Sequence, residues 1–206
     1  MHSTDRSHLG VNMSKVRIAV VVGSLRRESF NHQLAGALPT LAPADFEFKP
    51  VTIGDLPLYN QDDDANQADV VKRLKLEILA ADGLLFVTPE YNRSIPGVLK
   101  NAIDHASRPY GRNAWAGKPA GVIGVSTGAI GTALAQQHLR NVLAYLDVPV
   151  LGQPEAFIQA KEGLFDASGQ IGAGSKAFLQ KWMDAFVGFI HMHQNSKTVQ
   201  KGQAPP

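Results

Sequence analysis

Residues 16–31 have the sequence VRIAVVVGSLRRESFN. Its first seven residues form an apolar run rich in β-branched side chains, and the run ends at Gly23. A continuous apolar strand is typical of a parallel sheet, where both faces of the strand are buried. Ser29 is a good N-cap for a helix, which we expect from Phe30 to Leu38. The stretch therefore predicts a strand, a polar loop and a helix in direct succession.

The same succession recurs along the rest of the chain. Four more strands are expected at 46–53, 83–88, 119–126 and starting at 148–150. Four more helices are expected at about 67–80, 96–107, 132–146 and 175–192. Strands that alternate with helices in this way predict an α/β doubly wound parallel sheet with helices on both faces.

One domain accounts for the whole pattern. A chain of 206 residues is long enough for one ordinary domain with a substantial core. We found no internal repeat and no convincing linker. The expected domain spans 15–193, between a disordered N-terminal extension at 1–14 and a disordered, polar tail at 194–206.

Composition argues against several classes of function. Lys and Arg number 20 against 18 Asp and Glu, and this small excess does not predict a nucleic-acid or membrane partner. The chain has no cysteine, which excludes disulfides, thiolate nucleophiles and cysteine metal ligands. Its seven histidines are too scattered to predict a metal site. Without an apolar run long enough for a spanning helix or a signal peptide, the expected location is the cytoplasm.

Three loops carry unusual sets of polar residues, and they follow the first, third and fourth strands. They are GSLRRESFN at 23–31, TPEYNRSIPG at 88–97 and STGAIGT at 126–132. Right-handed crossovers place such loops together at the carboxyl edge of a parallel sheet, where ligands of these sheets bind. The sequence therefore predicts one ligand site made by all three loops.

The first loop has the chemistry of a phosphate site. The hydroxyls of Ser24 and Ser29, the amide of Asn31 and the guanidinium of Arg26 surround the start of a helix. The N-terminus of a helix carries positive partial charge and free N–H groups, which favour an anion. The loop matches neither GxxxxGK[ST] nor GxGxxG, so a mononucleotide such as FMN is favoured. The alternative is a capped helix with a surface arginine.

The other two loops suit a flat ring. Tyr91 and Asn92 project from a turn whose N–H groups can face the polar edge of a heterocycle, although a plain strand-ending turn is the alternative. Glu90 has either a structural role or one at the ring edge. Glycines in the third loop permit close backbone approach, and Ser126 and Thr127 add hydroxyl donors. Glycine-rich turns are common before helices, so this loop alone is weak support.

Four segments together resemble the NADPH-dependent FMN reductase family, especially its bacterial quinone and chromate reductase branch. They are GSLRRESFN, LPLYNQDD, TPEYNRSIPGVLKNAIDHASRP and VSTGAIGT, and the resemblance runs from about Lys15 to Met192. It implies a flavodoxin-like fold with five parallel strands in the order 2-1-3-4-5. It also implies FMN as the bound cofactor and NADPH or NADH as co-substrate.

The resemblance implies FMN contacts in all three loops. The phosphate loop contributes Ser24, Arg26, Ser29 and Asn31, with Phe30 beside them. The isoalloxazine and ribityl groups are matched by Pro89, Glu90, Tyr91 and Asn92, with Ser94 nearby. The loop near the ring contributes Ser126, Thr127 and Gly128. No catalytic side chain is implied, because the flavin N5 carries the chemistry.

The implied activity is a ping-pong reduction of small acceptors by NAD(P)H. Quinones, azo or nitro compounds, free flavin and chromate are the expected acceptors. A homodimer or homotetramer is also implied. The helix at 98–106, with Leu99, Ala102 and Ile103, is a candidate interface, unless it packs only on its own sheet.

Two other functions stay open. One is a flavodoxin-type electron carrier, although such carriers are usually strongly acidic, whereas this chain has a formal charge of +2. The other is a regulatory protein that binds flavin without turnover.

Overall fold

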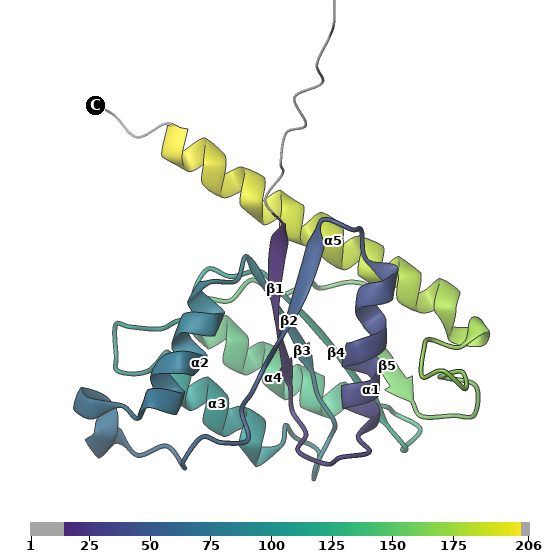
Figure 1. The fold of residues 1–206 in the computed structure, drawn as a ribbon, viewed down its shortest axis with the longest axis horizontal. Coiled ribbons are helices and arrows are strands. Elements are labelled where there is room, and N and C mark those ends of the chain that lie inside the picture. The colour runs from purple at the N-terminus through teal and green to yellow at the C-terminus, as the bar shows by residue number, and fades with distance from the viewer. Residues whose placement is uncertain (1–14, 203–206) are drawn as a thin grey trace, which may run out of the picture.

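Five parallel strands form a single sheet in the order β2-β1-β3-β4-β5, with helices on both faces (Figure 1). The structure is a computed structural model and describes the backbone of residues 15–202, with side chains up to residue 196. The strands are β1 (Val16–Val22), β2 (Phe46–Val51), β3 (Gly83–Val87), β4 (Ala120–Ser126) and β5 (Phe157–Gln159). The predicted doubly wound sheet and its strand order are confirmed.

Within residues 15–202, five α-helices and two short 3₁₀ helices lie between the strands or follow the last one. The α-helices are α1 (Phe30–Ala37), α2 (Asp69–Leu79), α3 (Gly97–Ser107), α4 (Ala133–Tyr145) and α5 (Ala173–Gly202). The 3₁₀ helices are η1 (Leu38–Leu41) and η2 (Gln61–Asn66). Helices α1 and α5 pack on one face of the sheet, and α2, α3 and α4 pack on the other.

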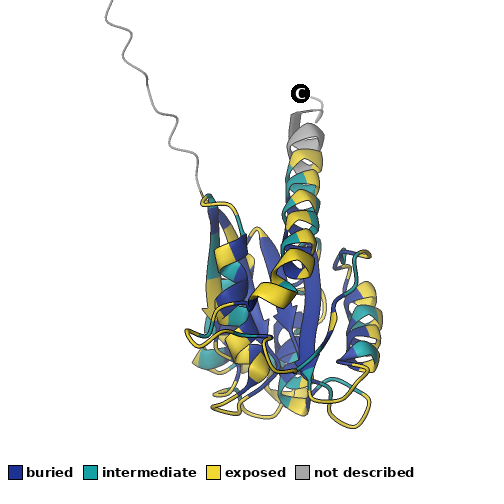
Figure 2. Cartoon of the chain, turned by 90° about the vertical axis from the view of Figure 1, so that its right-hand side faces the viewer, coloured by how far each residue is buried: buried dark blue, intermediate teal, exposed yellow. Residues whose placement is uncertain are grey.

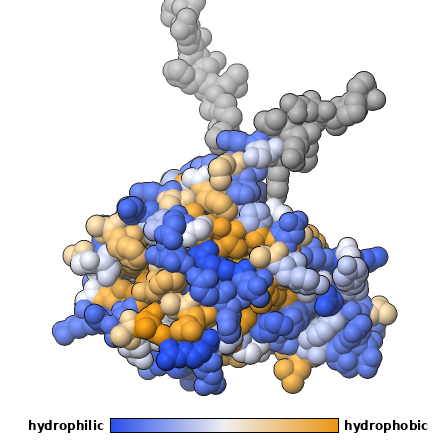
Figure 3. Space-filling model, turned by 180° about the vertical axis from the view of Figure 1, so that it is seen from behind, coloured by the Kyte–Doolittle hydropathy of each residue, from blue (hydrophilic) through white to orange (hydrophobic). Residues whose placement is uncertain are grey.

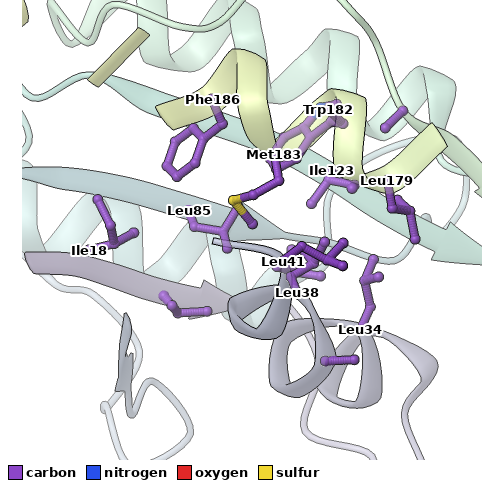
Figure 4. Packing of buried hydrophobic residues seen from close by; sticks show 14 of the residues in the cluster. Ile18, Leu34, Leu38, Leu41, Leu85, Ile123, Leu179, Trp182, Met183 and Phe186 are labelled. Carbon is purple, nitrogen blue, oxygen red and sulfur yellow. The ribbon is translucent and has the colours of Figure 1, made fainter. Parts of the chain in front are cut away.

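The continuous apolar run of β1 follows from this three-layer arrangement. Successive side chains of a strand point to opposite faces, so both sets must be apolar when both faces are covered. Ile18 and Val20 belong to the core between the sheet and helices α1 and α5, part of which Figure 4 shows. Ala19 and Val21 belong to the second core. Figure 2 shows the resulting buried sheet between helices whose outer sides are exposed.

The fifth strand lies later in the chain than predicted. Val150 forms only an isolated bridge to Ala120, whereas β5 itself pairs with the end of β4 at residues 124–126. Gly152 and Pro154 separate the two pairings. A proline has no N–H to donate to a strand ladder, so the edge is interrupted and resumes beyond it.

The last helix is longer than predicted. We expected it at 175–192 and a disordered tail from 194, whereas α5 continues to Gly202. No proline or glycine interrupts the mostly polar stretch from His193 to Lys201, and extending an existing helix costs far less than starting one. Residues 1–14 and 203–206, which we also expected to be disordered, lie outside the described residues.

The candidate interface residues of α3 face the molecule's own core. Leu99 and Ala102 are completely buried, and Ile103 is 1% exposed. They pack in the core formed with α2, α4 and the sheet. The prediction that these three side chains serve a subunit interface is therefore wrong, and packing on the chain's own sheet is what the structure shows.

Between residues 15 and 202, no helix combines the length and apolar character needed to cross a membrane. Across the same part of the chain, His, Asp and Glu side chains form no group of three or more that could hold a metal ion.

Candidate functional site

The three predicted loops lie together at the carboxyl edge of the sheet, the lower edge in Figure 1. Backbone hydrogen bonds hold their starting points side by side. The N–H of Gly23 donates to the carbonyl of Val87 at 2.9 Å, and the N–H of Thr88 donates to that of Ile123 at 3.0 Å. The loops after β1, β3 and β4 therefore leave adjacent strands at the same level.

The first loop surrounds the N-terminus of α1. Ser29 is the N-cap, and its Oγ accepts a hydrogen bond from the N–H of Asn31 at 3.2 Å. The Oγ of Ser24 accepts from the N–H of Arg26 at 3.3 Å. Both hydroxyl oxygens act as acceptors in these bonds, so each keeps its own proton to donate to an anion. Both serines are buried, which gives their hydroxyls fixed positions.

Arg26 adds a positive charge to the same loop. Arg26 is exposed, and its guanidinium carbon lies 5.6 Å from the centre of the Phe30 ring, at cation–π distance. A hollow of about 490 Å³ is lined by Arg26, Arg27, Glu28, Ser29, Phe30, His32 and Gln33. Hydroxyl donors, a guanidinium and a helix N-terminus are the donor set that suits a phosphate monoester. The residues present therefore fit the phosphate of FMN.

Asn31 has a role that the sequence did not predict. Its Nδ2 donates to the carbonyl of Val125, and its Oδ1 accepts from the N–H of the same residue, both at 2.9 Å. Beyond Thr88 the β3 strand gives way to Pro89, which has no N–H. The carboxamide of Asn31 makes the hydrogen bonds to β4 that β3 no longer makes there, and it joins α1 to β4. Its contact with a phosphate stays a prediction.

The second loop contains a tight two-residue turn. Tyr91 and Ser94 exchange two backbone hydrogen bonds of 3.0 Å, and Asn92 and Arg93 between them have φ angles of 51° and 64°. Positive φ at both central residues is the signature of a type I′ turn, for which asparagine is well suited. Tyr91 is 51% exposed, so its ring is accessible. The Oγ of Ser94 is hydrogen-bonded to Nδ1 of His138 at 2.9 Å.

Glu90 caps a helix that starts far away in sequence. Its Oε2 accepts hydrogen bonds from the N–H groups of Leu134 and Ala135, at 3.0 and 3.1 Å. The N-cap residue of α4, Thr132, makes no capping bond with its side chain. Glu90 satisfies those N–H groups instead and joins the second loop to the third. Of the two roles left open for Glu90, the structural one is visible here.

The third loop approaches its neighbours closely. The Oγ of Ser126 accepts from the N–H of Gly128 at 3.1 Å, and Thr127 and Gly128 are exposed. Gly131 has a φ of +60°, and a Cβ there would lie 2.6 Å from the backbone carbon of Phe157. Only glycine fits at such a distance and angle. The loop therefore presents exposed backbone and small polar groups at the sheet edge.

All the residues predicted to contact FMN lie on these three loops or on the first turn of α1. The sequence analysis assigned no role to Thr88. Its hydroxyl is completely buried and donates a hydrogen bond to the carbonyl of Pro89 at 2.8 Å. Its place at the end of an apolar strand, directly before a proline, was the available signal. The contact between His138 and Ser94 was not predicted either, because the two residues are 44 positions apart in the chain.

Comparisons with known proteins identify the family of the chain. The sequence model of the family described as NADPH-dependent FMN reductase matches residues 16–163. A 2-hydroxy-1,4-benzoquinone reductase from Burkholderia sp is 56% identical over 176 residues, covering 85% of this chain and 96% of that protein. A quinone reductase from Pseudomonas putida is 50% identical over 184 residues, covering 88% and 99% respectively.

Comparisons with solved structures agree with this family and with the flavodoxin-like fold. FerB from Paracoccus denitrificans, described as a flavoenzyme NAD(P)H:(acceptor) oxidoreductase, has a TM-score of 0.82 and 49% identity, covering 86% of this chain and 98% of its own. A flavodoxin from Pseudomonas aeruginosa, at 21% identity and a TM-score of 0.52, shares the fold alone; it covers 82% of this chain and 98% of its own. The chain belongs to the NADPH-dependent FMN reductase family and is an oxidoreductase with a flavodoxin-like fold.

Proposed function

We propose that this protein binds FMN, oxidises NADPH or NADH, and reduces a quinone. The observation that carries the proposal is the donor set of the first loop, which has two buried hydroxyls, a guanidinium and the N-terminus of α1. The names of the two relatives, a benzoquinone reductase and a quinone reductase, support the acceptor.

The phosphate end of FMN is assigned to the first loop. Ser24 and Ser29 donate through their hydroxyls, and Arg26 pairs with the dianion. The ring of Phe30 contacts the guanidinium of Arg26, at the distance already given. Asn31 completes the proposed set, either by its remaining N–H or by holding the loop to β4.

The ring end is assigned to the second and third loops. The turn made by Pro89, Glu90, Tyr91 and Asn92, with Ser94 nearby, lines the isoalloxazine and ribityl groups, and Tyr91 packs against the ring. Ser126, Thr127 and Gly128 supply backbone and hydroxyl groups close to it. Bound FMN would supply the redox chemistry, taking a hydride from the nicotinamide and returning electrons to the acceptor. No acidic or basic side chain is assigned a catalytic role.

The order of events proposed is ping-pong, with nicotinamide and acceptor using one open side of the site in turn. Exposure of Tyr91, Thr127 and Gly128 supports such an open side. An open site also tolerates acceptors of different shape. Azo and nitro compounds, free flavin and chromate are therefore proposed as further electron acceptors. The protein is further proposed to be a homodimer or homotetramer, as the family resemblance implies. Its proposed location is the cytoplasm, as expected from the sequence.

A visible spectrum of the purified protein, followed by anaerobic addition of NADPH or NADH, tests this function. We expect a flavin spectrum that bleaches with a nicotinamide and recovers when a quinone is added. Recovery with turnover separates the enzyme from a flavin-binding regulator. An electron carrier would bleach only with a partner reductase, and the chain's charge of +2 already differs from the acidic character of such carriers.

Arg26→Ala tests the assignment of the phosphate end. Losing one charge-assisted partner of a phosphate should raise the FMN dissociation constant roughly tenfold or more. Arg112→Ala is the control, because Arg112 is also an exposed arginine and lies between α3 and β4, outside the three loops. Titration of apoprotein with FMN, followed by quenching of flavin fluorescence, gives both constants. Equal affinity in the two variants would refute the assignment.

A further inference from the structure

The turn at residues 89–94 is fastened to α4 at two points. Glu90 accepts the N–H groups of Leu134 and Ala135, and Ser94 is hydrogen-bonded to His138. Residues 134 and 138 are four apart, which is about one helical turn. Two attachments one turn apart prevent the segment from pivoting on either of them.

The first attachment is electrostatically strong. The side chain of Glu90 is only 9% exposed, and the carboxylate lies at the N-terminus of α4, where the helix dipole is positive. Hydrogen bonds to a charged acceptor are roughly twice as strong as neutral ones. Arg93 adds a longer contact of 3.8 Å to the other carboxylate oxygen. A buried carboxylate held this way has a fixed position before any ligand arrives.

The carboxylate of Glu90 makes its hydrogen bonds to α4, which favours a structural role over a contact with a ligand. Both hydrogen bonds of Oε2 lead to α4, so the carboxylate points along the loop-to-helix junction. Its backbone, in contrast, belongs to the turn that carries Tyr91. Glu90 thus contributes its main chain to the turn and its side chain to the hydrogen bonds with α4.

We propose that Glu90 is a positioning residue that holds the turn at residues 89–94 against the first turn of α4, so that the second and third loops meet the flavin ring as one body. This inference rests on the proposed function. It assigns the carboxylate to preorganisation of the site and not to contact with the ring. Preorganised sites bind more tightly because less freedom is lost on binding.

Two substitutions of Glu90 test the inference. Glu90→Ala removes both hydrogen bonds, whereas Glu90→Gln keeps an acceptor oxygen of the same reach and removes the charge. In FMN-free protein, amide hydrogen exchange at Leu134 and Ala135 should be roughly tenfold faster in the alanine variant. The glutamine variant should lie within about threefold of the wild type, because a neutral acceptor still forms weaker bonds.

FMN affinity gives the second measurement. Glu90→Ala should raise the FMN dissociation constant roughly tenfold, and Glu90→Gln should recover most of that loss. Glu155→Ala is the matched control, because Glu155 accepts a hydrogen bond from Gln137 of α4 at 3.0 Å and lies outside the three loops. It should leave both the exchange and the affinity unchanged.

The outcomes distinguish the inference from the function. If wild-type protein binds FMN and both Glu90 variants lose affinity equally, with exchange at residues 134–135 unchanged, the carboxylate is a ring contact and the inference is overturned. Unchanged affinity in the alanine variant overturns it as well. If the wild type itself binds no FMN, the proposed function fails, and the inference fails with it.

Discussion

The carboxamide of Asn31 takes the place of a missing strand. The β3 strand leaves β4 at Pro89, and without a replacement the N–H and carbonyl of Val125 would be buried and unpaired. Asn31 is 3% exposed and satisfies both groups, although it lies 94 residues away from Val125 in the chain. A single side chain therefore completes the backbone hydrogen bonding at the site edge.

Replacing Asn31 should destabilise the protein even without a ligand. Asn31→Ala leaves two backbone groups of Val125 without partners, at an expected cost of about 2–4 kcal/mol in the free energy of unfolding. Urea denaturation of FMN-free protein gives this number. Asn141→Ala, at an exposed asparagine of α4, should change it little. A similar small change in both variants would contradict the structural role.

At the element scale, β3 and β4 approach each other through Gly124. A Cβ on Gly124 would lie 2.0 Å from the carbonyl oxygen of Thr88 and 2.5 Å from Oγ1 of Thr132. The loops after β3 and β4 are therefore as close as the absence of a side chain allows.

Gly124→Ala should force these two elements apart. The backbone oxygen of Thr88 cannot rotate away, so we expect a loss of about 1–3 kcal/mol of stability, together with weaker FMN binding. Gly36→Ala provides a control of opposite sign, because nothing lies within 4 Å of a Cβ there and the site is helical. Alanine should stabilise it by roughly 0.5–1 kcal/mol. Thermal unfolding of both variants measures the contrast, and a neutral Gly124→Ala would show that the strands can separate freely.

At the scale of the whole molecule, the described surface carries large apolar side chains that its own core does not use. Leu58 and Tyr110 are each 87% exposed, and Tyr145, at the end of α4, is 79% exposed. Figure 3 shows apolar areas between polar ones on the face turned away in Figure 1. Such areas are consistent with the proposed self-association, although the buried face of α3 takes no part in it.

Sedimentation velocity at micromolar concentration tests the proposed assembly. We expect a species with two or four times the chain mass of 22.2 kDa. Closed, symmetric dimers and tetramers are the commonest homo-oligomers. The measurement is best made with and without FMN, since the proposal does not require the cofactor for assembly. A monomer under both conditions would reject the homodimer and the homotetramer together.

Local sequence patterns were sufficient for most elements of the fold. The apolar run of 16–22 predicted β1, and the period of the apolar residues predicted four of the five helices closely, because these patterns depend on neighbours in the chain. The fifth strand was placed too early, since the bend at Gly152 and Pro154 is set by how the edge meets β4. The length of α5 was underestimated, because a polar stretch does not by itself end a helix that tertiary packing has already started.

Local patterns in the chain were enough to indicate the family and the three polar loops, with their hydroxyls and Arg26. The side chains that hold those loops together became visible only in the folded molecule. Asn31 meets Val125 and Glu90 meets Leu134 across 94 and 44 residues of chain. Contacts over such separations leave no periodic trace in the sequence, because they arise only when the sheet brings the ends of its strands to one edge.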